Sequence, residues 1–434
     1  MNAPVLLLIG VIIIVILAVV KVPLWVSMLC GTLFIVHFVN KMPVFGLLSN
    51  LAENLNKTSL MCVPFFIISG AIMQETSMAS RLINFCIVLL KKVKGGLAVA
   101  AIVANGLFGA VSGSSGAAVA LFGKILYVPL KDTYDEDVSL GLITTSAILA
   151  GIIPPSITFA VYGATTSTSV AKLFAAGAIP GIIIIIAMSI YIKIRLAGME
   201  KKGQYTPSQV KLMGNVSTLS LGKATVDAIP VFILLIGIFV GIYSGLFTPT
   251  EAAAFSVIYC LLYSAFSHDL NMKTIVRILK SGFKTTASIF ALFAAASAFA
   301  QAITVAQVPQ MVNSLIGGFS RFQFLLFLNV LLLIVGCLID VTPAILILAP
   351  IILPTAVALG VNLVHLGVIF TINLSIGFLT PPFGFNLFIS SSVTKAPISK
   401  VIHSVLPYTI ILFALILLFT YVPSICLFLP NLMR

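Results

Sequence analysis

Two short polar runs interrupt an otherwise apolar chain, and their residue types suit ion binding. One is SGSSG at 112–116, and the other is DVTP at 340–343. Hydroxyl, carboxylate and free carbonyl oxygens suit a small hard cation, whereas helix N-termini suit an anion. The two runs therefore indicate cation-coupled binding of an anionic solute.

Asp340 is the sharpest single residue in these runs, because its segment is otherwise free of charge. A carboxylate inside a membrane costs free energy and by default marks a functional site. The same side chain could instead cap the N-terminus of a helix. The sequence leaves both interpretations open.

A pair of adjacent prolines follows each polar run, Pro154-Pro155 and Pro381-Pro382, each within an apolar stretch of membrane length. Proline has no amide hydrogen and clashes with the preceding turn, so two in succession unwind a helix and free carbonyls. In hydrocarbon such a break must be buried in protein or line a water-filled cavity. Paired breaks in two chain halves are typical of the binding site of a secondary transporter.

The polar runs and the proline breaks together predict two cation sites and a substrate surface. The first cation site comprises Gly109, Ser112, Ser114, Ser115, Ile153, Pro154 and Ser156. The second, its mirror image, comprises Gly336, Asp340, Gly377, Thr380 and Phe383. The predicted substrate contacts are Thr165, Thr166, Asn386, Ser390 and Ser391. The alternative for each small or polar residue is close helix packing or an interhelical hydrogen bond.

Composition identifies the elements that must position these residues as membrane helices. The 434 residues are 60% hydrophobic and 8% charged, with a mean hydropathy of +1.21. Soluble domains carry roughly 25% charged residues. We therefore predict an all-α polytopic membrane protein, whose first apolar run lacks a signal-peptide cleavage pattern and forms an uncleaved helix.

Charge and cysteine usage exclude several function classes. The net charge of +13 is dispersed among loops, which argues against a nucleic-acid surface. If the polar stretch at 193–223 is cytoplasmic, eighteen of the 24 Lys and Arg residues fall on its side, a strong positive-inside bias. The six cysteines and four histidines show no metal-ligand spacing, so no cofactor is expected besides a coupling cation.

The two halves of the chain repeat, which predicts repeats at 1–222 and 223–434 that are inverted in the membrane. Landmarks recur at an offset of 224 to 227 residues: Pro23 with Pro249, Asn105 with Asn329, Pro129 with Pro354, Pro154 with Pro381, and Pro180 with Pro407. Each repeat would hold about five spans. They are at 3–20, 23–40, 59–76, 138–170 and 173–195 in the first repeat, and at 226–246, 249–267, 286–303, 363–395 and 402–429 in the second. The broken spans are 138–170 and 363–395.

Each repeat also contains a segment predicted to form a re-entrant hairpin, at about 96–130 and 321–359. Both are too short for two full crossings, which need about 40 apolar residues and a turn. The stretches 77–94 and 304–321 are predicted to lie along opposite membrane surfaces and to connect a fixed part to a moving part. The alternative is that they are ordinary short spans.

Enzyme and pump motifs are weak in this sequence. Ser169 and Lys172 fit S-x-x-K, but without other serine hydrolase elements, and the glycine-rich tip lacks the G-K-S/T of a P-loop. A channel is disfavoured because broken helices are duplicated without a repeated filter motif. We predict a carrier and not an enzyme.

With these residues in view, the chain resembles the large, DctM-type membrane subunit of tripartite ATP-independent periplasmic (TRAP) transporters. The resemblance rests on residues 105–120, 151–181, 245–259 and 336–388. It implies an elevator-type carrier, with a scaffold and a moving transport domain, in a bacterial inner membrane. It also implies Na+ symport of an organic acid, of the C4-dicarboxylate or sialic acid type, with a separate small four-helix subunit and a periplasmic solute-binding protein. The run KDTYDEDVS at 131–139 departs from the pattern in its acidity. The alternative is a stand-alone Na+/carboxylate elevator carrier or ion exchanger.

Overall fold

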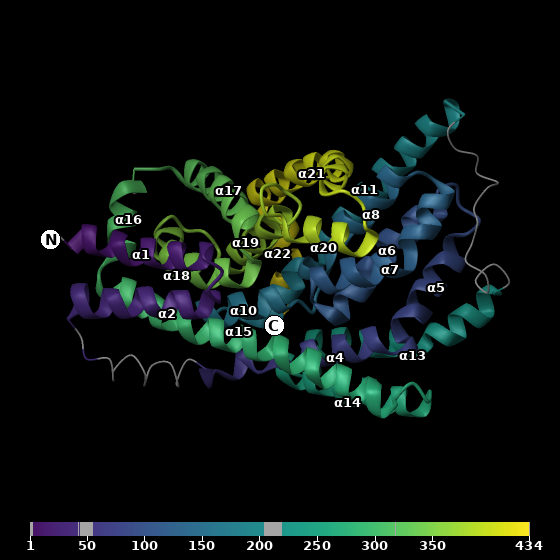
Figure 1. The fold of residues 1–434 in the computed structure, drawn as a ribbon, viewed down its shortest axis with the longest axis horizontal. Helices are drawn as coiled ribbons and strands as arrows, with labels where there is room; N and C mark the ends of the chain where they lie inside the picture. Colours follow the sequence, from purple (N-terminus) through teal and green to yellow (C-terminus); the bar gives the residue numbers. More distant parts are fainter. Residues whose placement is uncertain (1–2, 42, 44–54, 204–218, 317, 434) are drawn as a thin grey trace.

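The computed structural model is helical throughout its described residues, 3–41, 43, 55–203, 219–316 and 318–433 (Figure 1). Within them, eight helices are long and apolar enough to cross a membrane, or nine if a bent pair counts as one span. The prediction of an all-α polytopic membrane protein is confirmed.

The first half contains the following elements: α1 Ala3–Val19, α2 Leu24–Ile35 with the π-helix Val36–Asn40, the 3-10 turn η2 Thr58–Leu60, α4 Cys62–Glu75, α5 Ser77–Leu90, α6 Gly96–Ser112, α7 Ser115–Thr133, α8 Glu136–Ser146, α9 Leu149–Ile152, α10 Ile157–Thr166 and α11 Val170–Lys201. The second half contains α13 Leu221–Tyr243, α14 Pro249–Phe266, α15 Met272–Val305, α16 Val308–Ile316, α17 Arg321–Leu338, α18 Val341–Ala358, α19 Leu363–Gly377, α20 Phe385–Thr394, α21 Ile398–Tyr421 and α22 Pro423–Leu432.

Polar residues at the helix starts explain many of these boundaries. Thr248 and Glu251 form a reciprocal capping box at the start of α14, with Pro249 in the first turn. Ser320 and Gln323 do the same for α17. These side chains satisfy amide groups that have no partner within the helix.

Two elements differ from the predicted spans. Helix α15 begins at Met272, well before the predicted start at 286, because its first turns carry long basic side chains that are compatible with a helix. The predicted span at 402–429 is two helices, since Pro423 cannot continue α21. The predicted surface segment at 77–94 contains α5, which meets α4 at a bend of 71°. Part of the polar stretch at 193–223, including Lys211, lies outside the described residues.

The broken segment of the first half occupies the middle of the molecule. Of the most apolar window in Glu136–Thr166, 94% is buried inside the protein, compared with 28% for α14. Around it pack the helix pair α6–α7 and helix α18, while α1, α2, α14 and α15 lie along one side (Figure 1). An unwound segment in hydrocarbon needs this kind of protein cover.

By length and composition, α17 and α18 each qualify as a span, whereas α6 is shorter. Length therefore does not separate a re-entrant hairpin from two crossings in the second half. The hairpin assignment there stays a prediction.

Candidate functional site

Each helix pair touches the neighbouring broken helix through glycine. A Cβ atom at Gly109 would lie 2.4 Å from Cα of Ala150, and one at Gly377 would lie 2.3 Å from the carbonyl carbon of Gly336. Only a residue without a side chain permits such an approach. The contacts hold α6 against α9, and α17 against α19, at equivalent positions of the two halves.

Buried amide side chains connect the same elements. Asn105 donates to Oγ of Ser146 at 2.6 Å, and Asn373 donates to Oδ1 of Asn329 at 2.7 Å. All four residues are buried. Since buried polar groups are stabilised chiefly by such pairing, these bonds fix each helix pair to the helix that precedes its proline break.

At the first tip, Gly113 ends α6 with a φ of +58°, and Ser114 caps the start of α7. At the first break, the hydroxyls of Ser156 and Thr158 both donate to the carbonyl of Gly151, at 2.6 and 2.8 Å. The polar residues after the two prolines therefore satisfy a carbonyl that the break leaves without its helical partner.

At the second tip, Oδ1 of Asp340 accepts a hydrogen bond of 3.0 Å from the amide of Thr342 and caps α18. The capping interpretation is therefore confirmed, but it uses only one carboxylate oxygen. At the second break, Phe383 donates its amide to the carbonyl of Cys337 at 3.3 Å, and the Thr380 hydroxyl donates to Ile376.

Both tips line one cavity of about 900 Å³. Of the predicted cation ligands, it is lined by Ser112, Ser114, Ser115 and Asp340. Its walls also include Thr158 and Ser375 beside the breaks, and, from outside the hairpins, Trp25, Gln74, Ser281, Thr285 and Ser288. It is a chamber with polar and apolar walls between the hairpin tips and the α2, α4 and α15 side of the molecule.

Asn386 connects the first tip to the second broken helix. Its Nδ2 donates to Oγ of Ser115 at 2.7 Å and to the carbonyl of Thr144 at 3.4 Å. The predicted substrate residue Ser390 accepts a bond from the Thr144 hydroxyl at 2.7 Å. Both residues thus join the two halves of the chain next to the cavity without lining it.

The remaining predicted residues lie behind the tips or away from the cavity. Gly109, Ile153, Pro154, Ser156, Gly336, Gly377, Thr380 and Phe383 do not line it. Ser391 donates to the carbonyl of Ala396. Thr165 and Thr166 end α10, where their hydroxyls donate to carbonyls of the same helix. The structure therefore does not bring the predicted substrate residues together.

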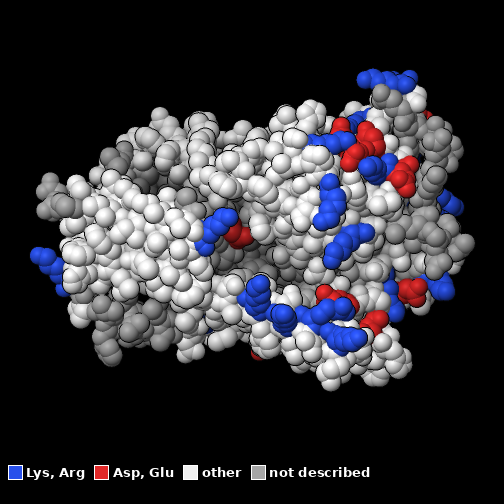
Figure 2. All heavy atoms as spheres, in the orientation of Figure 1, with Lys and Arg blue, Asp and Glu red and all other residues white. Residues whose placement is uncertain are grey.

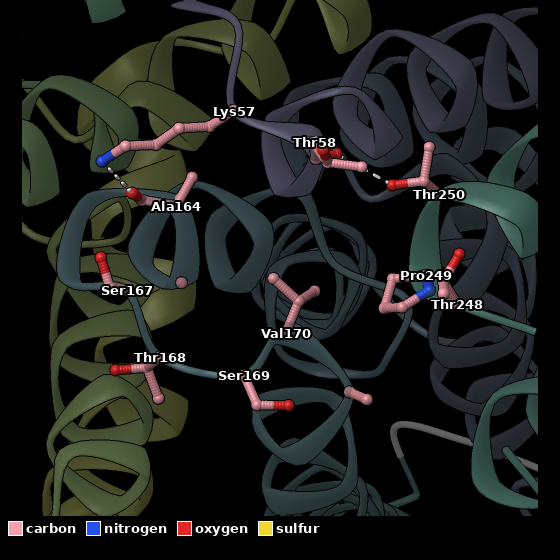
Figure 3. Close-up of a pocket in the computed structure, with 12 residues that line it drawn as sticks. Lys57, Thr58, Ala164, Ser167, Thr168, Ser169, Val170, Thr248, Pro249 and Thr250 are labelled. Atoms are coloured by element: carbon pink, nitrogen blue, oxygen red, sulfur yellow. Dashed lines mark hydrogen bonds between the residues drawn. The ribbon is translucent and has the colours of Figure 1, made fainter. Parts of the chain in front are cut away.

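A second cavity, of about 670 Å³, lies beyond the end of α10 (Figure 3). There Nζ of Lys57 donates to the carbonyl of Ala164 at 3.3 Å, and Thr250 donates to the carbonyl of Thr58 at 3.0 Å. Figure 3 shows that the hydroxyl-bearing loop from Ser167 to Ser169 forms the facing wall. The lysine connects the segment before α4 to α10.

A family model decides the identity of the chain. The model described as the DctM component of the tripartite ATP-independent periplasmic transporter matches residues 8–425. The chain belongs to the DctM family of TRAP transporter large permeases. The resemblance inferred from the sequence is confirmed, and this DctM-family permease is a multi-pass membrane transporter subunit.

Named relatives extend over nearly the whole permease. The C4-dicarboxylate TRAP large permease of Pseudomonas aeruginosa is 38% identical over 394 residues, which cover 89% of this chain and 90% of that protein. The 2,3-diketo-L-gulonate TRAP large permease of Escherichia coli is 31% identical over 92% of this chain and 93% of its own. The isethionate TRAP permease DctMQ of Oleidesulfovibrio alaskensis is 32% identical over 94% of this chain and 64% of that protein.

A solved structure supports the fold alone. The YdaH transporter of Alcanivorax borkumensis, whose topology is described as unusual, superimposes with a TM-score of 0.63 over 86% of both chains at 13% identity.

Several residues of the site went unnoticed in the sequence. Ser281, Thr285 and Ser288 recur at helical spacing on α15, so the polar stripe was visible but its partner surface was not.

Proposed function

We propose that this permease carries out Na+-coupled uptake of an organic acid across a bacterial inner membrane, together with a small TRAP membrane subunit and a periplasmic solute-binding protein. The relatives are named for C4-dicarboxylates, isethionate and 2,3-diketo-L-gulonate, all of them organic anions. Membership of a tripartite transporter family supports the need for partners. It disfavours a stand-alone carrier.

Two buried oxygens without hydrogen-bond partners support the cation site at the first tip. Oγ of Ser112 and Oδ1 of Asn386 are buried at the first tip, and neither has a hydrogen-bond partner among the described residues. A buried oxygen without a partner costs about 1–3 kcal/mol. A bound Na+ would remove that cost, because it is a hard cation that takes oxygen ligands. Ser115 would hold Asn386 in place through its hydrogen bond.

The second half offers a matching oxygen. Asp340 lines the cavity and has one carboxylate oxygen engaged by the α18 amide, which leaves the other for a cation. A substrate carboxylate would then bind near the cations, in the chamber walled by Ser281, Thr285 and Ser288.

The way the elements are connected supports an elevator movement. The hydrogen bonds of Asn105 and Asn373 hold each helix pair to its broken helix, so these elements would move as one transport domain. Helices α4, α14 and α15, which pack against one another, would form part of the scaffold. Inward movement of each net positive charge yields about 2.3 kcal/mol per 100 mV of membrane potential.

Proteoliposome uptake tests this function. The permease is reconstituted with and without its small subunit and solute-binding protein, and radiolabelled succinate, sialic acid and isethionate are supplied under an inward Na+ gradient. We expect uptake of at least one solute that requires all three components and fails when K+ replaces Na+. Uptake by the permease alone, or uptake indifferent to Na+, would contradict the proposal.

A further inference from the structure

Helix α15 carries a row of basic side chains, Lys273, Arg277, Lys280 and Lys284, called here the basic row. Their spacing of four, three and four residues places them on one face of the helix, and all four are exposed. Figure 2 shows blue side chains following α15 along the edge of a hollow in this face of the molecule. The row is therefore a continuous cationic strip.

The basic row leads into the cavity. Lys284 directly precedes Thr285, which lines the cavity with Ser281 and Ser288. At about 100° per residue, these hydroxyl residues lie roughly a quarter turn around α15 from the row. The strip and the cavity wall are thus adjacent faces of the same helix.

Few anionic groups neutralise the row. Arg277 pairs with Glu75 at 3.0 Å, but Lys273, Lys280 and Lys284 have no ion-pair partner among the described residues. Figure 2 shows further basic side chains across the hollow, over α7 and α20. Lys124 on α7 and Lys395 at the end of α20 are exposed and are likewise without ion pairs in the part of the chain described.

The row also points toward one end of the molecule. Basic residues gather where α11 ends and α13 and α15 begin (Figure 2). By the positive-inside rule, this end faces the cytoplasm. A cationic strip between a cavity and the cytoplasm lowers the free energy of an anion along that route, whereas it does not change the free energy of a neutral solute.

We propose that the basic row is the route by which an organic anion passes between the cavity and the cytoplasm. The inference rests on the proposed uptake of an organic acid and adds residues that favour anions over neutral solutes. Phosphate groups of anionic lipids share the same chemistry. The experiment therefore has to separate a free anion from a lipid headgroup.

Trp25 provides the reporter, because it is the only tryptophan in the chain and lines the cavity. Its fluorescence is quenched by iodide or by neutral acrylamide, in detergent and in phosphatidylcholine vesicles, with potassium salts at constant low ionic strength. We expect Lys280→Gln/Lys284→Gln to lower the iodide quenching constant by about twofold and to leave the acrylamide constant unchanged. Lys223→Gln, an exposed basic residue of α13, is the matched control and should change neither constant.

Equal iodide quenching in the double variant and the wild type would overturn the proposal. It would also be overturned if adding phosphatidylglycerol abolished the iodide effect in the wild type, because lipid headgroups would then occupy the row. This readout needs no transport, so it fails or succeeds independently of the proposed function. In the uptake assay, the double variant should slow anion uptake severalfold without changing the Na+ concentration that gives half-maximal rate.

Discussion

The contact between Gly336 and Gly377 allows a direct test of how α17 packs against α19. In Gly377→Ala, the new Cβ would lie 2.3 Å from the carbonyl carbon of Gly336, whereas ordinary contacts are 3.4–4 Å. Because the opposing atom is backbone, no rotamer change can relieve the overlap. Helices α17 and α19 must therefore separate by at least about 1 Å.

The energetic cost has two parts. Overpacking a close contact typically costs about 1–3 kcal/mol. The hydrogen bond between Asn373 and Asn329 lies in the same interface at 2.7 Å, and a separation of about 1 Å would take it beyond hydrogen-bond range. Loss of that one bond adds about 0.5–1.5 kcal/mol, because Asn373 still donates to the carbonyl of Ile369 and Asn329 still accepts from the Thr420 hydroxyl. We therefore expect a destabilisation of roughly 1.5–4.5 kcal/mol.

The assay is thermal unfolding in detergent combined with Na+-dependent uptake. Gly377→Ala should melt well below the wild type and lose most uptake, since Asp340 follows Gly336 by one helical turn and would move with α17. Gly198→Ala is the control, because nothing lies within 4 Å of its Cβ position and alanine favours the helix. Wild-type melting and uptake in Gly377→Ala would refute the proposed packing.

Three further predictions follow from the site. Ser112→Ala should raise the Na+ concentration for half-maximal uptake by roughly tenfold, equivalent to about 1.4 kcal/mol for one lost ligand, and an unchanged value would remove Ser112 from the site. Asp340→Asn keeps a capping oxygen but removes the charge, so the variant should melt like the wild type while its uptake depends less on Na+. If the Na+ dependence of uptake is unchanged, the carboxylate has only its capping role. Lys57→Met should lower the free energy of unfolding by about 0.3–1 kcal/mol, because it removes a cation from the C-terminal end of α10. Lys172→Met is the control, and identical melting temperatures of the two variants would contradict the contact between Lys57 and the carbonyl of Ala164.

Local chemistry made much of the fold predictable. Proline pairs, glycine-rich tips and capping residues act on their own neighbours, so the helix interruptions at Pro154 and Pro381 could be read directly from the sequence. Composition likewise fixed the membrane class. The helix break before Pro423 was equally local, but its apolar flanks hid it within one hydrophobic run.

The rest depends on contacts between distant parts of the chain. Asn386 and Ser115 are 271 residues apart, and no local pattern indicates that the two halves meet at the first tip. The α15 wall of the cavity could not be predicted either, because its serines and threonines resemble any polar stripe on a helix. Thr165 and Thr166 were predicted to contact substrate, yet their hydroxyls bond to carbonyls within α10 and neither residue lines the cavity at the tips.

Equilibrium binding of radioactive sodium to the purified permease tests the central claim most directly, because it separates ion binding from partners, solute and transport. We predict saturable binding that K+ does not displace, weakened by Ser112→Ala and by Asp340→Asn but not by Gly198→Ala. Absence of saturable binding, or binding of equal strength in all four proteins, would contradict a cation site at the hairpin tips.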